Sequence, residues 1–278
     1  MVKHFFELMR PLNSFMAALA VLIGAYIVAG TDVLGSSYLY LAIIATFLIS
    51  GGGMAINDYF DRGIDTLSKP HRPIPSGRIS VNAALIFSLV LFAVGVYISL
   101  FINIYCFILA LINSILLIAY SYHFKKVTVL GHVIVSYLVA SSFLFGGIVV
   151  YQLGNLLGLF ILFMLAFFAN MSREIIKTIE DMRADRFGKV KSIPIVYGEK
   201  TARKVASVLL AIAVILAPLP YLLKVLDEVY LLVVSIGVVL FIFSIIWNER
   251  ETPPDRIHRL MKYGMLISLL AFLLGAIF

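Results

Sequence analysis

Long stretches of apolar residues alternate with short polar links along the whole chain. Each stretch has about 18–24 residues, the length that an α-helix needs to cross the hydrocarbon core of a bilayer. The stretches lack the apolar–polar alternation of membrane β-strands, which argues against a barrel. The pattern therefore predicts an all-α polytopic membrane protein. Its nine spans are expected at residues 12–30, 38–57, 81–101, 103–121, 129–151, 155–179, 203–222, 229–247 and 260–277.

The composition supports this fold class. Of the 278 residues, 62% are hydrophobic and only 13% are charged, with a mean hydropathy of +1.04. Such a chain satisfies its backbone in lipid by forming helices. The first apolar stretch follows a short basic head, as in a signal peptide, but it is long and has no small-x-small cleavage site. We therefore expect it to be retained as the first span.

The basic residues lie almost entirely on one side of the predicted membrane. The N-terminal segment and the links after spans 2, 4, 6 and 8 hold 21 of the 22 Lys and Arg residues, and only Lys224 lies on the other side. The positive-inside rule then predicts a cytoplasmic N-terminus and an external C-terminus. This topology explains most of the net charge of +7, and no soluble basic module indicates nucleic acid as a partner.

The end of the second span carries an unusual set of polar residues. Asn57 and Asp61 are four residues apart, Asp58 and Asp61 are three apart, and Asp61 and Asp65 are four apart, so all four share one helix face. Like charges at this spacing repel, and anions near a helix C-terminus oppose the macrodipole by about 0.3–1 kcal/mol each. Positive charge is needed nearby.

Neighbouring cations or a bound metal ion are the two candidate sources of that charge. Arg62, Lys69, Arg72 and Arg78 follow the acidic residues in the sequence, and His71 among them is a candidate phosphate contact. Carboxylate and amide oxygens without paired Cys or His suit a hard ion, and Mg²⁺ fits best. A solvated charged loop between two spans is the simpler alternative.

A second acidic cluster makes that alternative less attractive. At the end of the sixth span it contains Glu174, Lys177, Glu180, Asp181 and Asp185. Each cluster follows an apolar helix and precedes a basic loop rich in Pro and Gly. We predict one domain over residues 1–278, with spans 1–4 and 5–8 as a pseudo-repeat and span 9 added. The two acidic faces would then meet across a central cavity.

Facing carboxylate clusters can hold Mg²⁺ ions that bridge a diphosphate, with Lys and Arg completing the charge balance. A diphosphate whose charge is neutralised is a good leaving group, and an allylic carbon skeleton would then ionise. Patterns for serine, cysteine, zinc-peptidase and P-loop chemistry are absent from the sequence. The remaining histidines, His4, His123, His132 and His258, are interpreted as interfacial polar residues.

These motifs resemble those of the UbiA superfamily of intramembrane prenyltransferases. The resemblance rests on Asn57-Asp58-x-x-Asp61-x-x-x-Asp65, Asp181-x-x-x-Asp185, the loop from Arg72 to Gly77, Tyr120-Ser121 with Lys125-Lys126, Ile193-Pro194 and Tyr197-Gly198. It implies nine helices around a central cavity that opens sideways to lipid. It also implies two acidic motifs that bind a prenyl diphosphate through Mg²⁺.

The resemblance assigns roles to particular residues. The implied metal and diphosphate ligands, whose aspartates are also the expected catalytic residues, are Asn57, Asp58, Asp61, Asp65, Asp181 and Asp185. The implied substrate contacts are Arg10, Asn13, Asn57, Arg62, Lys69, His71, Arg72, Tyr120, Lys125, Lys126, Lys177 and Lys189.

Within the superfamily, the sequences of the Asn57–Asp61 motif and of the loop from Pro70 to Arg78 are most similar to two branches. These are the archaeal digeranylgeranylglyceryl phosphate synthases and the chlorophyll synthases. The short chain and the segment from Arg173 to Lys177 favour the archaeal branch. That resemblance implies geranylgeranyl transfer from its diphosphate to the hydroxyl of geranylgeranylglyceryl phosphate, which forms the second ether bond of archaeal lipids.

Three alternatives stay open at this point. A related enzyme would prenylate an aromatic quinone precursor, chlorophyllide or haem. A CDP-alcohol phosphotransferase would carry one compact acidic motif, whereas here two motifs are far apart in the sequence. A transporter would place its site near the bilayer midplane on broken helices, whereas these charges gather at one membrane face.

Overall fold

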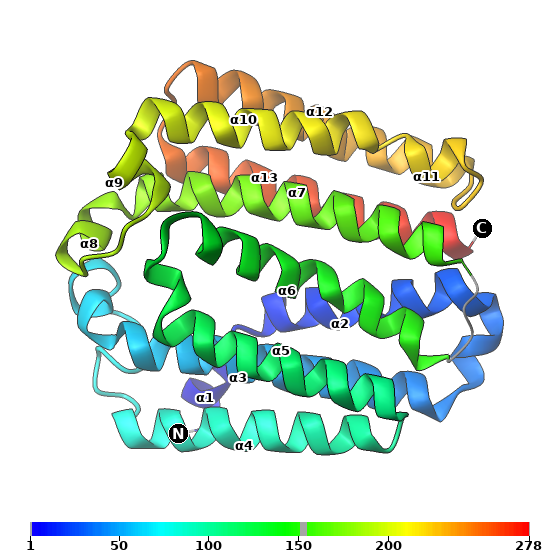
Figure 1. Cartoon of the computed structure of the whole chain (residues 1–278), viewed down its shortest axis with the longest axis horizontal. Helices are drawn as coiled ribbons and strands as arrows, with labels where there is room; N and C mark the ends of the chain where they lie inside the picture. Colours follow the sequence, from blue (N-terminus) through cyan, green and yellow to red (C-terminus); the bar gives the residue numbers. More distant parts are fainter. Residues whose placement is uncertain (1, 151–154, 278) are drawn as a thin grey trace.

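In the computed structural model, which describes residues 2–150 and 155–277, long α-helices run side by side (Figure 1). Within those residues, nine helical segments are long and apolar enough to cross a membrane, which confirms the predicted spans. The long helices are α2 (Pro11–Ala29), α3 (Ser37–Ser68), α4 (Val81–Leu100), α5 (Ile104–Tyr122), α6 (Thr128–Val149), α7 (Leu156–Glu180), α10 (Glu199–Leu216), α12 (Glu228–Glu249) and α13 (Pro254–Ile277). The seventh span combines α10 with the short helix α11 (Leu219–Leu222).

Five short helical elements lie outside or between the long helices and were not predicted. They are α1 (Val2–Leu8), η1 (Gly30–Gly35), η2 (Phe124–Lys126), α8 (Met182–Phe187) and α9 (Ile193–Tyr197). Residue 151, the predicted end of the fifth span, lies outside the described residues.

The helix α3 is much longer than the predicted span of 38–57. Its 32 residues correspond to about 48 Å, well beyond the thickness of a hydrocarbon core of about 30 Å. The helix continues through the polar residues because its first strong breaker is Pro70, and the residue before a proline is disfavoured in the α region. Lys69 accordingly leaves the helix with φ −143° and ψ 59°. The first acidic motif therefore lies on regular helix.

One end of the helical bundle gathers the polar connections. Figure 1 shows α8, α9 and the segment after α3 at this end, and the C-terminal end of α13 at the opposite end. Lys224 directly follows α11, which also lies at the opposite end. The structure thus places the lone basic exception where the sequence predicted it. Orientation in a cell and the pseudo-repeat stay predictions.

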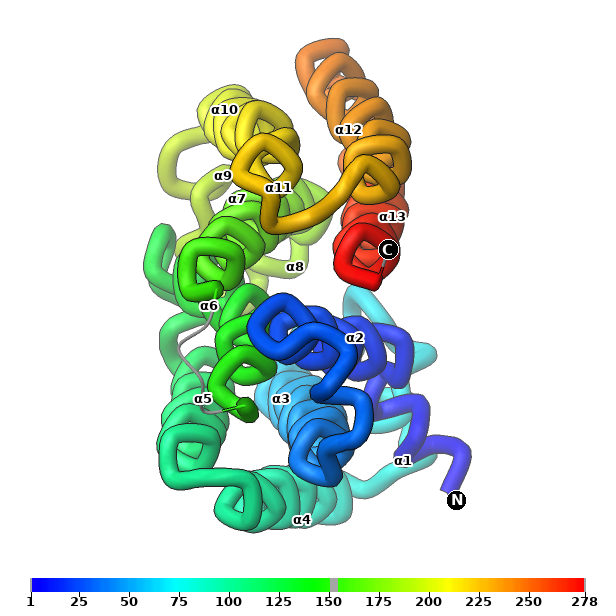
Figure 2. The backbone as a smooth tube through the Cα atoms, turned by 90° about the vertical axis from the view of Figure 1, so that its right-hand side faces the viewer, coloured from blue at the N-terminus to red at the C-terminus, as the bar shows by residue number. Residues whose placement is uncertain are grey.

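The helices α2 and α6 cross with their backbones in direct contact. Figure 2, which looks roughly along the helices, shows the two side by side. A Cβ atom built on Gly24 would lie 2.1 Å from the Phe143 carbonyl oxygen, and one on Gly146 would lie 2.0 Å from the Val21 carbonyl oxygen. Small residues allow such close approach between membrane helices. This crossing fixes the position of α2 against α6.

We expect Gly146→Ala to destabilise the protein by about 1–3 kcal/mol, because the added methyl group overpacks a contact between two backbones. Thermal unfolding of the purified protein in detergent measures the effect. Gly63→Ala is the matched control, since a Cβ on Gly63 meets nothing within 4 Å. An alanine there should stabilise α3 by roughly 0.5–1 kcal/mol. Equal stability of Gly146→Ala and the wild type would contradict the close crossing.

Candidate active site

Three carboxylates of α3 lie on one face of its last turns and are buried. Asp58, Asp61 and Asp65 are 3%, 7% and 3% exposed. Their spacing of three and four residues stacks them along the helix. Burial of like charges is strongly unfavourable unless cations lie beside them. The partners of these carboxylates therefore determine whether this face is stable.

Two arginines hold the first and last of these carboxylates. Arg72 donates through Nη1 to Asp58 Oδ1 at 3.0 Å and to Asp65 Oδ2 at 2.6 Å. Arg10, at the start of α2, also pairs with Asp58. Arg72 reaches the helix because its own segment folds back beneath α3, where Ile74 is buried in a small apolar cluster. One guanidinium nitrogen, which carries two hydrogens, thus bridges two carboxylates.

The middle carboxylate, Asp61, has different partners. Asn57 donates through Nδ2 to Asp61 Oδ2 at 2.9 Å, and Lys125 forms an ion pair with the same oxygen. Lys125 belongs to η2, at the start of α6. The first acidic motif is therefore held by residues from α2, the segment after α3, and η2.

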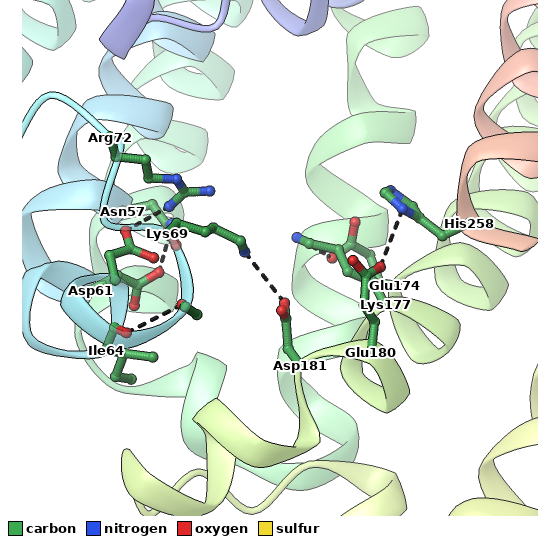
Figure 3. A network of polar contacts seen from close by, with 12 residues as sticks. Asn57, Asp61, Ile64, Lys69, Arg72, Glu174, Lys177, Glu180, Asp181 and His258 are labelled. Atoms are coloured by element: carbon green, nitrogen blue, oxygen red, sulfur yellow. Dashed lines mark hydrogen bonds and ion pairs between the residues drawn. The ribbon is translucent and has the colours of Figure 1, made fainter. Parts of the chain in front are cut away.

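The second acidic motif faces the first across a gap. Figure 3 shows Lys69 extending from the segment after α3 toward Asp181, and Lys69 Nζ lies 3.6 Å from Asp181 Oδ2. About two turns earlier, on α7, the buried Glu174 accepts from Arg173 at 2.6 Å and lies 3.5 Å from Lys177 Nζ. Basic residues therefore separate the two motifs and contact both of them.

Among the described residues, Asp185 of α8 is the one aspartate of either motif that has a fully buried oxygen without a hydrogen-bond partner. Its side chain is buried, and its Oδ2 finds no hydrogen-bond partner among the described residues. Burial raises the pKa of Asp185 to about 6. A carboxylate oxygen of this kind is suited to a cation that arrives with a ligand.

The donor set has the chemistry that Mg²⁺ prefers, since carboxylates and an amide surround a polar gap. In the described part of the chain, however, no three His, Cys, Asp or Glu side chains lie close enough together to hold a metal ion. The carboxylates are instead engaged by Lys and Arg. One or two of these carboxylates could coordinate Mg²⁺ directly. Water or phosphate oxygens would then fill the rest of its octahedral coordination shell.

Both motifs line a single polar cavity of ≈ 80 Å³. The predicted residues that line it are Arg10, Asn57, Asp61, Asp65, Lys69, Arg72, Tyr120, Lys125, Lys177, Asp181 and Asp185. Asp58 is paired with two residues of this lining, Arg10 and Arg72. The central prediction, that two distant acidic segments meet at one hollow, is confirmed.

A larger apolar cavity of ≈ 250 Å³ lies next to the polar one. Along α7, Asn170 and Arg173 line the apolar cavity, and Glu174 and Lys177, within the next turn, line the polar one. Asn13, a predicted substrate contact, lines the apolar cavity. A molecule with a charged head and a long apolar tail would match this succession of surfaces.

Besides Asn13, four predicted substrate contacts do not reach the polar cavity. The side chains of Arg62, His71, Lys126 and Lys189 are exposed and are not among its described lining residues. Arg62 instead lies over the Tyr59 ring, with its guanidinium carbon 4.8 Å from the ring centroid. Helical spacing explains this, because the residue after Asp61 points about 100° away from it.

The cation Arg78 also serves a purpose that the sequence did not indicate. Its guanidinium donates to both carboxylate oxygens of Glu7, at 2.8 and 3.0 Å, and so ties the loop to α1. These hydrogen bonds lower the pKa of Glu7. Arg78 therefore does not neutralise the acidic motif.

Sequence reasoning missed several residues of the polar cavity. His132, interpreted above as an interfacial residue, is 7% exposed and lines the cavity from α6, together with Thr128. Thr178 and the buried Ser192 line it as well. His132 lies four residues after Thr128 and thus shares its helix face, which is the one signal in the sequence that could have revealed it.

Fold and site together define the class: a multi-pass helical membrane protein with a charged cavity that adjoins an apolar one. The chain belongs to the UbiA prenyltransferase family, whose sequence profile matches residues 17–270. It is therefore an intramembrane prenyltransferase. Over 280 residues it is 42% identical to digeranylgeranylglyceryl phosphate synthase of Methanococcus maripaludis, with 100% of this chain and 99% of the relative covered.

Solved structures have the same fold. One that concerns digeranylgeranylglyceryl phosphate synthase in membranes matches with a TM-score of 0.77 at 38% identity, covering 99% of this chain and 98% of the other. A UbiA homologue from Archaeoglobus fulgidus bound to GPP and Mg²⁺ matches with a TM-score of 0.75, covering 99% of both chains. At 22% identity, this second similarity shows the fold alone.

We expect Arg72→Met to destabilise the ligand-free protein by about 1.5–3 kcal/mol, because two buried carboxylates lose a charged hydrogen-bond donor. Thermal unfolding in detergent without added Mg²⁺ is the measurement. Arg62→Met is the matched control and should have little effect, since Arg62 is exposed. If the two variants unfold at the same temperature, the bridging role of Arg72 is wrong.

Proposed function

We propose that this protein transfers a geranylgeranyl group from geranylgeranyl diphosphate to the free hydroxyl of geranylgeranylglyceryl phosphate, in a Mg²⁺-dependent reaction. The observation that carries the proposal is the polar cavity that contains both acidic motifs and adjoins the apolar cavity. The extensive similarity to relatives named digeranylgeranylglyceryl phosphate synthase supports the choice of acceptor.

The donor's two chemical parts match the two cavities. Its diphosphate would occupy the polar cavity, among the aspartates and the basic side chains that now contact them. Its prenyl chain would lie in the apolar cavity, where burial of apolar surface contributes about 25 cal/mol per Å². The allylic carbon is thereby held where the two cavities adjoin, near Asn170 and Arg173 of α7.

The aspartates would hold Mg²⁺, which when bound neutralises the diphosphate and makes it a better leaving group. Lys69, Arg72 and Lys125 now pair with Asp181, Asp58, Asp65 and Asp61. When substrate arrives, these three cations exchange carboxylate oxygens for diphosphate oxygens. Their positive charge then stabilises the negative charge that develops on the leaving group.

The bond changes are a simple substitution. The bond between the allylic carbon and the diphosphate oxygen breaks, and its electron pair stays on the diphosphate. The acceptor hydroxyl oxygen forms a new bond to that carbon, and the hydroxyl proton passes to an oxygen of the departing diphosphate. The apolar walls exclude water, which would otherwise capture the allylic cation.

The distribution of charge supports a reaction at one membrane face. The acidic motifs lie at the end of the bundle that carries the basic links, so by the positive-inside rule we infer an active site directed to the cytoplasm. The whole chain acts as one domain in this proposal, and the apolar cavity opens sideways to admit both lipid-like substrates.

We expect Asp61→Ala and Asp181→Ala each to lower Mg²⁺-dependent diphosphate release by about 100- to 1,000-fold or more, while the protein still inserts into membranes. Chelation of Mg²⁺ should abolish turnover in the wild type, and its re-addition should restore it. Asp255→Ala is the control, since this aspartate is exposed and pairs with Arg259 on the surface. Unchanged turnover in either motif variant would refute the metal assignment.

The acceptor is tested separately. Purified protein is given geranylgeranyl diphosphate with geranylgeranylglyceryl phosphate, an aromatic quinone precursor, a chlorophyllide or haem, and products are identified by mass. We expect a product only with the glyceryl phosphate. Prenylation of one of the other acceptors, with none of the glyceryl phosphate, would replace the proposed reaction.

A further inference from the structure

The apolar cavity has two cations in its lining that the acidic motifs do not account for. Arg173 of α7 and Lys262 of α13 both line it, among walls that are otherwise mostly apolar. Neither contacts an aspartate of the two motifs. A charged group beside an apolar cavity is costly unless it has a partner.

Lys262 has no partner in the described part of the chain. The structure gives its ammonium group neither a hydrogen bond nor an ion pair with any described residue. The charged side chains near enough to interact electrostatically with it are Arg173, Arg10 and Lys177. All three are cations and repel it. The side chain is also half-buried, so it is only partly solvated.

The nearby carboxylates do not balance these charges. Glu174 is shared between Arg173 and Lys177, and Asp58 is shared between Arg10 and Arg72. Arg173 also has its Nε buried without a hydrogen-bond partner. The group formed by Arg173 and Lys262 therefore has spare donors and excess positive charge, which indicates an anionic ligand.

The proposed reaction restricts where the second anion, the phosphate of the acceptor, can lie. The acceptor's hydroxyl and its phosphate sit on one three-carbon glyceryl unit, so they are only a few bonds apart. The hydroxyl has to reach the allylic carbon, whose diphosphate occupies the polar cavity. The acceptor phosphate must therefore lie beside the junction of the two cavities but outside the diphosphate position.

We propose that Arg173 and Lys262, in the lining of the apolar cavity, form the subsite for the phosphate of the acceptor, apart from the acidic motifs that take the donor diphosphate. This inference rests on the proposed function and adds a location for the second substrate. Two separate anion sites would also keep the acceptor from binding in the donor's place. Lys262 is thus the residue that distinguishes a phosphate-bearing acceptor from a neutral one.

Binding to the intact protein in detergent tests the subsite without turnover. The probes are geranylgeranylglyceryl phosphate and its dephosphorylated form, geranylgeranylglycerol, measured by calorimetry in the absence of donor. We expect the wild type to prefer the phosphate form and Lys262→Gln to lose about 10- to 100-fold of that preference, the range for a charged hydrogen bond. Lys262→Arg should retain most of it.

Arg259→Gln is the matched control, because it removes one positive charge from the same helix at an exposed position paired with Asp255. Its preference should equal that of the wild type. An unchanged preference in Lys262→Gln, or an equal loss in Arg259→Gln, would overturn the proposal. Equal competition by phosphatidate supplied in nanodiscs would assign the cations to bulk lipid headgroups instead and would also overturn it.

Steady-state turnover separates this inference from the proposed function. In Lys262→Gln the KM for the acceptor should rise by about tenfold or more while the KM for geranylgeranyl diphosphate stays the same. If the wild type makes the ether product and Lys262→Gln has an unchanged acceptor KM, the subsite is wrong and the function stands. If the wild type binds the phosphate lipid through Lys262 but prenylates only another acceptor, the function is wrong and the anion subsite stands.

Discussion

Charge compensation at one end of the bundle is the constraint on which the site depends. Asp58, Asp61 and Asp65 are buried on one face of α3, where three like charges could not persist alone. The chain supplies cations from separate elements, with Arg72 from the segment that folds back beneath α3 and Lys125 from η2. The same ion pairs that stabilise the ligand-free protein therefore hold in place the side chains that we propose bind the diphosphate.

Two environments follow from this arrangement. The polar cavity is rich in both signs of charge, so a charged ligand meets groups of the opposite sign there. The apolar cavity beside it offers dispersion contacts and excludes water. Because α7 contributes to both, a substrate bound across their junction is oriented by one rigid helix. Such a design favours long isoprenoid substrates with charged heads and disfavours small soluble ones.

Hydropathy and charge spacing were sufficient to predict the helical spans and the meeting of two acidic motifs, since both follow from helical periodicity and bilayer thickness. They could not predict the length of α3, which continues to Ser68, just before Pro70, rather than ending where its apolar residues end. They also could not say which cations turn inward. Arg62 and Arg72 look equivalent in sequence, but only the fold of the loop brings Arg72 beneath the helix, while Arg62 lies over Tyr59 on the surface. His132 was missed because its only sequence signal, the shared helix face with Thr128, is weak on an otherwise apolar helix.

The contact between α2 and α6 restricts how the protein can move. Gly24 and Gly146 bring each backbone against a carbonyl oxygen of the other helix, so neither helix can slide past the other without a steric collision. The two helices therefore behave as one rigid unit. Any movement that lets a branched isoprenoid enter from the bilayer has to occur between other pairs of helices.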